Sequence, residues 1–309
     1  MDPERRSGSD PYRLDTRSVR RAFERAAATY DSAAVLEREI GQRMAERLAL
    51  VKLEPAAILD AGCGTGEGLA ELHTRFPQAA IAGLDIAFAM LTAARQRLSA
   101  GAAEGRTLAR LFGAEGPRPS VALVGADLRR LPFAAGAFDL VWSNLALQWI
   151  NDPPLAFAEF RRVLRAGGLL TFTTFGPDTL VELKAAFSEV DRAPHVSRFV
   201  DMHDLGDMLL DAGFAEPVMD MEKLTLTYVD ALALMRDLKA TGARNAMLGR
   251  RRGLTGRRRW DRMTRALEAF RRHDRLPASF EVVYGHAWKP EPRLAEDGRA
   301  IVRLHRPPR

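Results

Sequence analysis

The sequence predicts an α/β fold in which a mostly parallel sheet carries helices on both faces. Three observations lead to this prediction. Short apolar segments alternate with helical segments between residues 57 and 175. A glycine-rich turn follows the first of these apolar segments, and the helix expected over 153–164 begins with proline and is followed by Gly167-Gly168. Alternating strands and helices are typical of parallel sheets, because each crossover helix packs back onto the sheet.

The individual elements follow from apolar runs and helical periodicity. We expect five core strands over 57–60, 80–84, 121–124, 138–143 and 169–174, with helices over 66–75, 88–98 and 153–164 between them. Residues 101–120 hold several glycines and prolines and are predicted to be a loop-rich insertion. Further along, helices are expected from 177 to 190, 202–212, 230–241 and 258–272, and strands over 218–228 and 280–288, for seven strands in all.

The domain organisation is expected to be simple. Residues 1–15 are polar and predicted to be a disordered tail, and 290–309 a loose basic tail. Between them, residues 16–289 are expected to form a single domain. It would comprise N-terminal helices over 16–50, a cofactor-binding core over 56–175, and an acceptor cap with closing strands over 176–289. Tyr30-Asp31-Ser32 interrupts the N-terminal helical pattern, which predicts two helices with a break.

Composition narrows the class of protein. The chain has 309 residues, 47% hydrophobic and 28% charged, as is ordinary for a globular enzyme. A single cysteine, Cys63, excludes an internal disulfide and suits a reducing compartment, and no apolar run is long enough to span a membrane. We therefore expect a cytoplasmic protein.

The net charge is +6, and residues 250–259 include six arginines and no acid. Such a cluster fits a nucleic acid, an acidic protein, a membrane surface or simply a solvated loop.

The glycine-rich turn indicates the kind of cofactor. Asp60 ends the first expected strand, and Gly62, Gly64 and Gly66 follow it. Glycines let the backbone approach a ligand, and the helix start behind them offers free N–H donors. The spacing differs from the Gly-x-Gly-x-x-Gly that holds a pyrophosphate. An acid at Asp60 would repel a phosphate but suits a cationic methionine moiety, which favours S-adenosylmethionine over a dinucleotide.

Two further acids end the neighbouring strands. Asp85, followed by Ile86, is placed to bind ribose hydroxyls of either nucleoside cofactor. Asp127 can accept a hydrogen bond from an adenine amino group, with Leu128 against the ring, although a turn residue or helix cap is an equal interpretation of Asp127. Asn144, just after the fourth strand, completes the expected cofactor-binding residues.

These motifs resemble those of the class I methyltransferases, which have a Rossmann-like fold. The resemblance covers about 57–175 and rests on Leu-Asp-Ala-Gly-Cys-Gly-Thr-Gly, Asp-Leu-x-x-Leu-Pro-Phe and Phe-Asp-Leu-Val. Four other segments, at 22–31, 142–149, 190–199 and 233–243, are similar to the malonyl-acyl-carrier-protein O-methyltransferase family; they include Ser-Asn-Leu-Ala-x-Gln-Trp and Pro-His-x-x-Arg-Phe. The resemblance then extends over about 17–289.

That family implies a specific reaction. Its members use S-adenosylmethionine, without a metal, to methylate the free carboxylate of a malonyl thioester on acyl carrier protein, the first step toward the pimeloyl chain of biotin. Malonyl coenzyme A is the alternative thioester. Acyl carrier protein is acidic, so it is a suitable partner for the cluster Arg250–Arg259, and neither a nucleic acid nor a membrane is expected as a partner. A malonyl carboxylate is already ionised at neutral pH, so no general base is needed.

We therefore look for a group that holds a carboxylate. Arg198 is the first candidate, because a guanidinium binds a carboxylate bidentately; a surface ion pair is the alternative. Tyr30 is expected to cover the cofactor or donate to the acceptor, or else to pack between helices. His195 is expected to hydrogen-bond the malonyl thioester, or to cap a helix. Lys239 is the weakest candidate, since a lysine on an amphipathic helix is usually solvated.

Two aromatic residues are expected to line the acceptor pocket, Trp149 and Phe199, although a buried tryptophan more often serves packing.

Other functions remain open at this point. A related assembly factor hydroxylates a protein arginine but lacks an arginine at the position of Arg198. Another small carboxylic acid is an alternative acceptor. A nucleic-acid methyltransferase is suggested by the pI near 9.9 and by Asn151-Asp152-Pro153-Pro154, but Leu155 offers no aromatic face to stack a base. Three ligand-holding positions in register argue against a non-enzymatic binding module.

Overall fold

A seven-stranded sheet forms the centre of the computed structural model, which describes residues 10–111, 121–253 and 255–291. The strands are β1 (Ala57–Ala61), β2 (Ala80–Asp85), β3 (Val121–Gly125), β4 (Phe138–Ser143), β5 (Leu164–Phe175), β6 (Ala215–Tyr228) and β7 (Leu276–Trp288). Their order in the sheet is β3-β2-β1-β4-β5-β7-β6. Six strands run parallel and β7 alone runs against its neighbours β5 and β6. The predicted α/β class and mostly parallel sheet are therefore confirmed.

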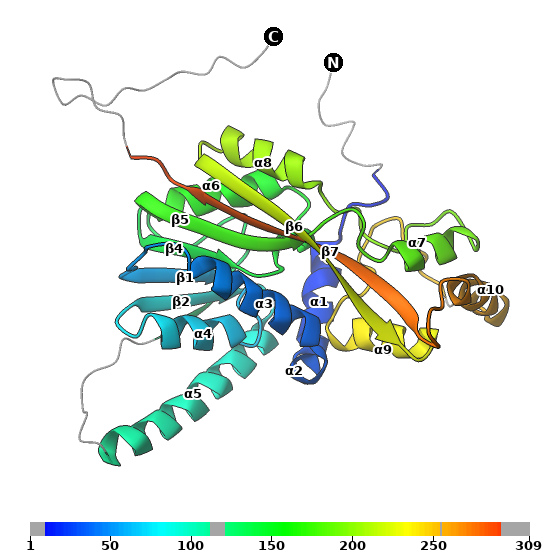
Figure 1. Ribbon diagram of the computed structural model, residues 1–309, viewed down its shortest axis with the longest axis horizontal. Helices are drawn as coiled ribbons and strands as arrows, with labels where there is room; N and C mark the ends of the chain where they lie inside the picture. The colour runs from blue at the N-terminus through cyan, green and yellow to red at the C-terminus, as the bar shows by residue number, and fades with distance from the viewer. Residues whose placement is uncertain (1–9, 112–120, 254, 292–309) are drawn as a thin grey trace, which may run out of the picture.

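Helices cover both faces of the sheet (Figure 1). On one face lie α3 (Val35–Leu48), α4 (Glu67–Arg75) and α5 (Phe88–Leu111), and on the other α6 (Pro153–Val163) and α8 (Met202–Asp211). The first layer buries Ile40, Met44 and Leu69 against the sheet, and the second buries Phe157 and Phe160. Each of these side chains is at most 1% exposed. Central strands covered on both faces are mostly apolar, and every residue of β4 is buried, including the polar Asp139 and Ser143.

The remaining helices lie near the ends of the strands. Short N-terminal helices α1 (Thr16–Ala26) and α2 (Tyr30–Ala33) precede α3, and a 3-10 turn (Leu147–Trp149) follows β4. Toward the right of Figure 1, α10 (Arg257–Glu268) packs against α7 (Val181–Ser188), and α9 (Ala231–Ala240) packs against β6 and α2. No helix within the described ranges is long and apolar enough to cross a membrane.

One predicted loop is a helix. Residues 101–111, expected to begin a loop-rich insertion, continue α5 as far as Leu111, so that part of the prediction is wrong. Glycine inside a helix costs only about 1 kcal/mol relative to alanine. Alanine, leucine and arginine surround Gly101 and Gly105 and favour the helix. The rest of the predicted insertion, 112–120, lies outside the described residues.

The predicted N-terminal tail also needs correction. Leu14 is only 8% exposed and pairs through its backbone with Met247. The Asn151 side chain accepts from Leu14 N at 2.7 Å and donates to Leu14 O at 3.0 Å. Residues 10–15 are therefore packed against the domain, because an amide side chain satisfies both backbone groups of Leu14. Residues 1–9 and 292–309, which hold most of the two predicted tails, lie outside the described residues.

Candidate functional site

The site lies where the strand order reverses, between β1 and β4. In a parallel sheet, ligands bind at this switch point, outside the carboxyl ends of the strands. The turn after β1 has Gly62 at φ +94° and Gly64 at φ +51°, conformations that other residues rarely adopt. A Cβ on Gly62 would lie 2.4 Å from the Ala146 Cβ, whereas a Cβ on Gly64 would meet open space. Gly62 thus permits close packing of the turn after β1 on the turn after β4, and Gly64 leaves room for a ligand.

Two adjoining cavities open at these strand ends. The first lies between the acids of β2 and β3 and the inner face of α1; its lining includes Thr16, Val19, Phe23, Asp85, Ile86, Met90, Asp127, Leu128, Arg129 and Trp149. The second lies under α3; its lining includes Asp31, Glu37, Arg38, Gln42, Asp60, Thr65 and Trp142. Four residues line both: Tyr30, Gly62, Gly64 and Asn144. An elongated ligand with an apolar ring at one end and charged groups at the other fits this pair of cavities.

Asp85 is held by backbone donors at the start of the first cavity. Its carboxylate accepts from Gly64 N at 3.0 Å and from Ala87 N at 2.8 Å. Burial raises the pKa of Asp85 to about 6, although these two N–H groups oppose the shift. The carboxylate keeps lone pairs for further donors, such as hydroxyl groups of a ligand.

Asp60 is the unusual group of the second cavity. It is 2% exposed, and its carboxylate accepts no hydrogen bond from any described residue. Burial, followed by the nearby charge of Asp85, raises the pKa of Asp60 to about 8. The indole N–H of Trp142 in the same wall is also buried without a partner among the described residues. An unpaired buried carboxyl is costly to the free protein, so its position indicates a cationic ligand.

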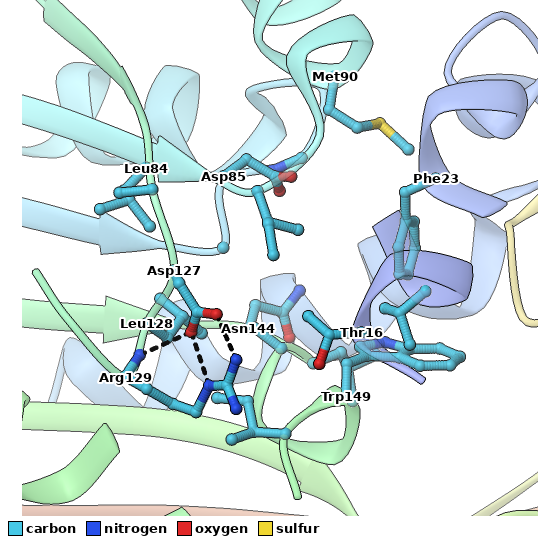
Figure 2. Close-up of a pocket in the computed structure, with 18 of the residues that line it drawn as sticks. Thr16, Phe23, Leu84, Asp85, Met90, Asp127, Leu128, Arg129, Asn144 and Trp149 are labelled. Atoms are coloured by element: carbon cyan, nitrogen blue, oxygen red, sulfur yellow. Dashed lines mark hydrogen bonds and ion pairs between the residues drawn. The ribbon is translucent and has the colours of Figure 1, made fainter. Parts of the chain in front are cut away.

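Asp127 has a partner within its own turn. The Arg129 guanidinium donates to both carboxylate oxygens, at 3.0 and 2.6 Å, and the Arg129 backbone N donates at 2.9 Å (Figure 2). These hydrogen bonds hold the pKa of Asp127 below its usual range. Asp127 is therefore a turn residue that also lines the cavity wall, and its role toward adenine stays a prediction. Nothing in the sequence pattern indicated Arg129.

Asn144 and Leu145 connect the site to the helices above it. The Asn144 amide donates to Glu37 O at 3.0 Å, and its oxygen accepts from the Thr173 hydroxyl at 2.6 Å. Leu145 follows at φ +50°, a strained conformation for leucine, and its N–H donates to the Thr173 hydroxyl at 2.9 Å. Asn144 lines both cavities while its polar atoms position α3 over β4.

Polar contacts close the N-terminal helices over the strand ends. Glu24 of α1 accepts from the backbone N of Phe88 at 2.8 Å and of Ala89 at 2.9 Å, at the start of α5. Asp31 of α2 accepts from the Thr65 hydroxyl at 2.6 Å and pairs with Arg97 at 2.7 Å. Tyr30 lies between these two anchors, so its position over both cavities follows from them.

The other residues predicted to hold the acceptor are dispersed. Arg198 stacks over the Tyr12 ring at 4.3 Å. The His195 imidazole donates to the Asp191 carboxylate at 2.8 Å and stacks on the Phe187 ring at 3.8 Å, and Phe199 packs edge-on against Phe175. Neither cavity is lined by Arg198, His195 or Phe199, nor by Lys239, which is exposed in the last turn of α9. Of the predicted acceptor residues, Tyr30 and Trp149 line the first cavity.

Comparison with known proteins identifies the family. Residues 59–172 match the model of a methyltransferase domain. The chain is 53% identical over 300 residues to a malonyl-acyl-carrier-protein O-methyltransferase of Laribacter hongkongensis, covering 96% of this chain and 98% of the relative. It is 52% identical over 290 residues to the protein of the same name from Gallionella capsiferriformans, covering 94% and 96%. The chain belongs to the malonyl-acyl-carrier-protein O-methyltransferase family. The family resemblance stated from the sequence is confirmed.

The fold is shared more widely than the family. The crystal structure of the YcgJ protein from Bacillus subtilis aligns with a TM-score of 0.52 at 18% identity and covers 80% of this chain and 98% of that one. At that identity the likeness concerns the fold alone.

One residue of the predicted site serves the packing of helices and not a cavity wall. Gly66 is the N-cap of α4 at φ +85°, and a Cβ there would lie 3.0 Å from Ala94, so Gly66 lets α4 approach α5 and lines neither cavity. Conversely, Val19 and Phe23 of α1 were not among the predicted site residues, and both line the first cavity. Their spacing indicates an apolar face, but nothing in it tells that this face meets a cavity.

The arginine cluster divides between two places. Arg250 donates to Met247 O at 2.8 Å and to the Ser18 hydroxyl at 3.2 Å, beside α1. Arg251 pairs with Asp191 at 3.8 Å, while Arg257 begins α10. The cluster is therefore not one continuous surface. In the described residues no group of three acids, histidines or cysteines is placed to hold a metal ion.

Proposed function

We propose that this chain transfers the methyl group of S-adenosylmethionine to the free carboxylate of a malonyl thioester on acyl carrier protein, the first step toward the pimeloyl chain of biotin. One observation carries the proposal. The unpaired carboxyl of Asp60, the ribose-binding position of Asp85 and the adenine-binding position of Asp127 line adjoining cavities in a chain that matches this family over its length.

The residues present fit the cofactor. Asp60 would bind the cationic methionine moiety, Asp85 the ribose hydroxyls, and Asp127 with Leu128 the adenine ring. When bound, S-adenosylmethionine supplies an electrophilic methyl group on a positively charged sulfur. Gly62 and Gly64 line both cavities, and the open space beside Gly64 is where the two ends of the ligand would join.

Methyl transfer to a carboxylate depends on the orientation of the reacting atoms more than on acid–base groups. A malonyl carboxylate is ionised at neutral pH, so the chain has no proton to remove. Correct alignment of the reacting atoms can lower a barrier by several kcal/mol, up to about 7–11 kcal/mol in ideal cases. The anchored helices α1 and α2 supply this alignment and exclude water, with Tyr30 placed between the cavities.

Arg198 remains our proposed holder of the malonyl carboxylate. Stacking on Tyr12 uses the face of the guanidinium and leaves its edge N–H donors free for a carboxylate. Among the described residues Arg198 forms no ion pair, which distinguishes it from the surface pair considered from the sequence. His195, occupied by Asp191, and Lys239 have weaker support.

A labelled-methyl transfer assay with purified protein tests the proposal. The substrates are malonyl, succinyl and acetyl carrier-protein thioesters, with malonyl coenzyme A as a fourth. We expect transfer to the malonyl carrier, less to the longer succinyl chain, and none to the acetyl thioester, which has no carboxylate. Absence of transfer to both malonyl thioesters would refute the function. Rescue of a biotin-requiring strain tests the pathway, and we place the reaction in the cytoplasm, since the lone buried Cys63 suits a reducing compartment.

A further inference from the structure

Helix α1 has two faces of different chemistry. Its inner face buries Val19, Ala22 and Ala26, and Thr16, Val19 and Phe23 line the first cavity. Its outer face carries Arg17, Arg21 and Arg25, all exposed. Residues four apart lie on the same side of a helix, so these arginines form one stripe about 12 Å long. Arg20 lies beside the stripe and pairs with Glu24 at 3.4 Å.

The stripe is not explained by the stability of the fold. Among the described residues, Arg17, Arg21 and Arg25 form no ion pair, and like charges four residues apart destabilise a helix. Arginines on α3 behave differently: Arg43 pairs with Glu39 at 2.7 Å and Arg47 with Asp220 at 2.9 Å. An unpaired row of like charges that costs stability indicates a partner of opposite charge.

We propose that the stripe formed by Arg17, Arg21 and Arg25 on the outer face of α1 is the docking surface for the acidic carrier protein. This inference rests on the proposed function, which supplies a partner of matching charge. The geometry supports it, because α1 alone separates the stripe from the first cavity. A partner docked there lies about one helix diameter, roughly 10 Å, from the acceptor, a span suited to a flexible thioester arm. Arg250, bonded to Ser18 in the first turn of α1, extends the basic surface.

The other basic helix makes a poorer docking surface. Exposed arginines on α10 include Arg258, Arg262 and Arg265, but α10 packs against α7 and no residue of it lines either described cavity. Charge alone would treat the two helices alike. Proximity to the cavity distinguishes them, and this makes α10 a matched control for α1.

The experiment compares two triple charge reversals with the wild type. One carries Arg17→Glu, Arg21→Glu and Arg25→Glu; the control carries Arg258→Glu, Arg262→Glu and Arg265→Glu. For the first we expect the KM for malonyl carrier protein to rise about 10-fold or more, with kcat nearly unchanged, since steering charges act mainly on encounter. The KM of the wild type should rise with salt, and that of the α1 variant should respond much less. The α10 variant should resemble the wild type.

Further readouts separate docking from folding and from function. Affinity for S-adenosylmethionine and transfer to malonyl pantetheine, which has no protein surface to dock, should stay within about 2-fold of wild type. If the reversed helix unfolds, the milder Arg→Gln triple variant replaces it. Direct binding of fluorescent malonyl carrier tests the surface even if the wild type transfers no methyl group, so the inference and the proposed function fail separately. The inference is overturned if the α1 variant binds the carrier as tightly as the wild type, or if only the α10 variant loses affinity for the carrier. It is also overturned if the α1 variant loses affinity for a DNA oligonucleotide but not for the carrier.

Discussion

Replacing Asp60 by asparagine tests whether the site is built for a cation at the expense of stability. The carboxyl is 2% exposed, accepts no hydrogen bond from the described residues, and has its pKa raised from 3.8 to about 8. Asparagine has nearly the same shape but carries no charge. We expect Asp60→Asn to stabilise the free protein at pH 7 and to weaken the binding of S-adenosylmethionine.

The magnitude follows from proton linkage. In the unfolded chain Asp60 is ionised at pH 7, so folding must either bury a charge or take up a proton. At about 1.4 kcal/mol per pKa unit between 3.8 and 7, the limit is about 4 kcal/mol. Water in the cavity and structural relaxation reduce this, so we expect a gain of about 1–3 kcal/mol in the free energy of unfolding. Loss of the buried carboxylate from the complex should weaken cofactor binding by about 2–4 kcal/mol, or roughly 30- to 1000-fold.

The sign of the pH dependence is fixed by the same shift. Because the folded pKa lies above the unfolded value, the native state binds more protons between about pH 4 and 8. The stability of the wild type therefore falls as pH rises through that window. Urea unfolding from pH 5 to 8 should show this slope, and Asp60→Asn should reduce it, most clearly above pH 7. At lower pH a slope of the same sign remains, because the pKa of Asp85 is raised to about 6 and that of Glu37 to about 7. Calorimetric titration with S-adenosylmethionine near pH 7 should detect more proton release in the wild type than in Asp60→Asn.

Asp139 provides a matched control. It is also a buried aspartate, 3% exposed, but it accepts from Ala56 N at 2.6 Å and from Ala57 N at 3.0 Å and pairs with Arg165 at 2.6 Å. Asp139→Asn should destabilise the protein by about 1–3 kcal/mol. If Asp60→Asn is as destabilising as Asp139→Asn, or binds the cofactor as tightly as the wild type, Asp60 is not a cation site that costs stability.

Three other predictions concern the same cavities. Gly62→Ala should lower the free energy of unfolding in urea by about 2–4 kcal/mol, because φ is +94° and the new Cβ would lie 2.4 Å from that of Ala146. Gly64→Ala has open space at its Cβ and should lower it by only about 1–2 kcal/mol. Equal losses in the two variants would contradict this explanation. Tyr30→Phe keeps the aromatic ring in the wall of both cavities but removes a hydroxyl that has no partner among the described residues. We expect kcat to fall about 10-fold while the Kd for the cofactor stays within about 2-fold of wild type. A large change in this Kd, with kcat unchanged, would mean that Tyr30 serves cofactor binding alone. Arg129→Lys removes the bidentate hydrogen bonding of the guanidinium to Asp127 and should weaken cofactor binding, measured by calorimetry, about 3- to 10-fold. An unchanged Kd would show that Asp127 does not need these two hydrogen bonds.

The sequence by itself determined the fold class, the cofactor loop and the acids at the strand ends. Alternation of strands and helices requires a parallel sheet, and parallel strands bring their carboxyl ends to one edge. For this reason Asp60, Asp85 and Asp127, far apart in the chain, could be placed together from the order of the strands alone. Family resemblance extended this to Tyr30 and Trp149, which do line the first cavity.

Only the tertiary structure decided what each of these residues meets. Periodicity identifies the apolar face of a helix but not its neighbour, so it does not show that Phe23, which packs against Trp149, also lines the first cavity. The pairing of Asp127 with Arg129, the lack of any described partner for Asp60, and the anchoring of Leu14 by Asn151 depend on side-chain directions and long-range packing. Local sequence patterns carry information about a residue's own segment, whereas electrostatic environment and cavity walls arise from segments that meet only when the chain folds.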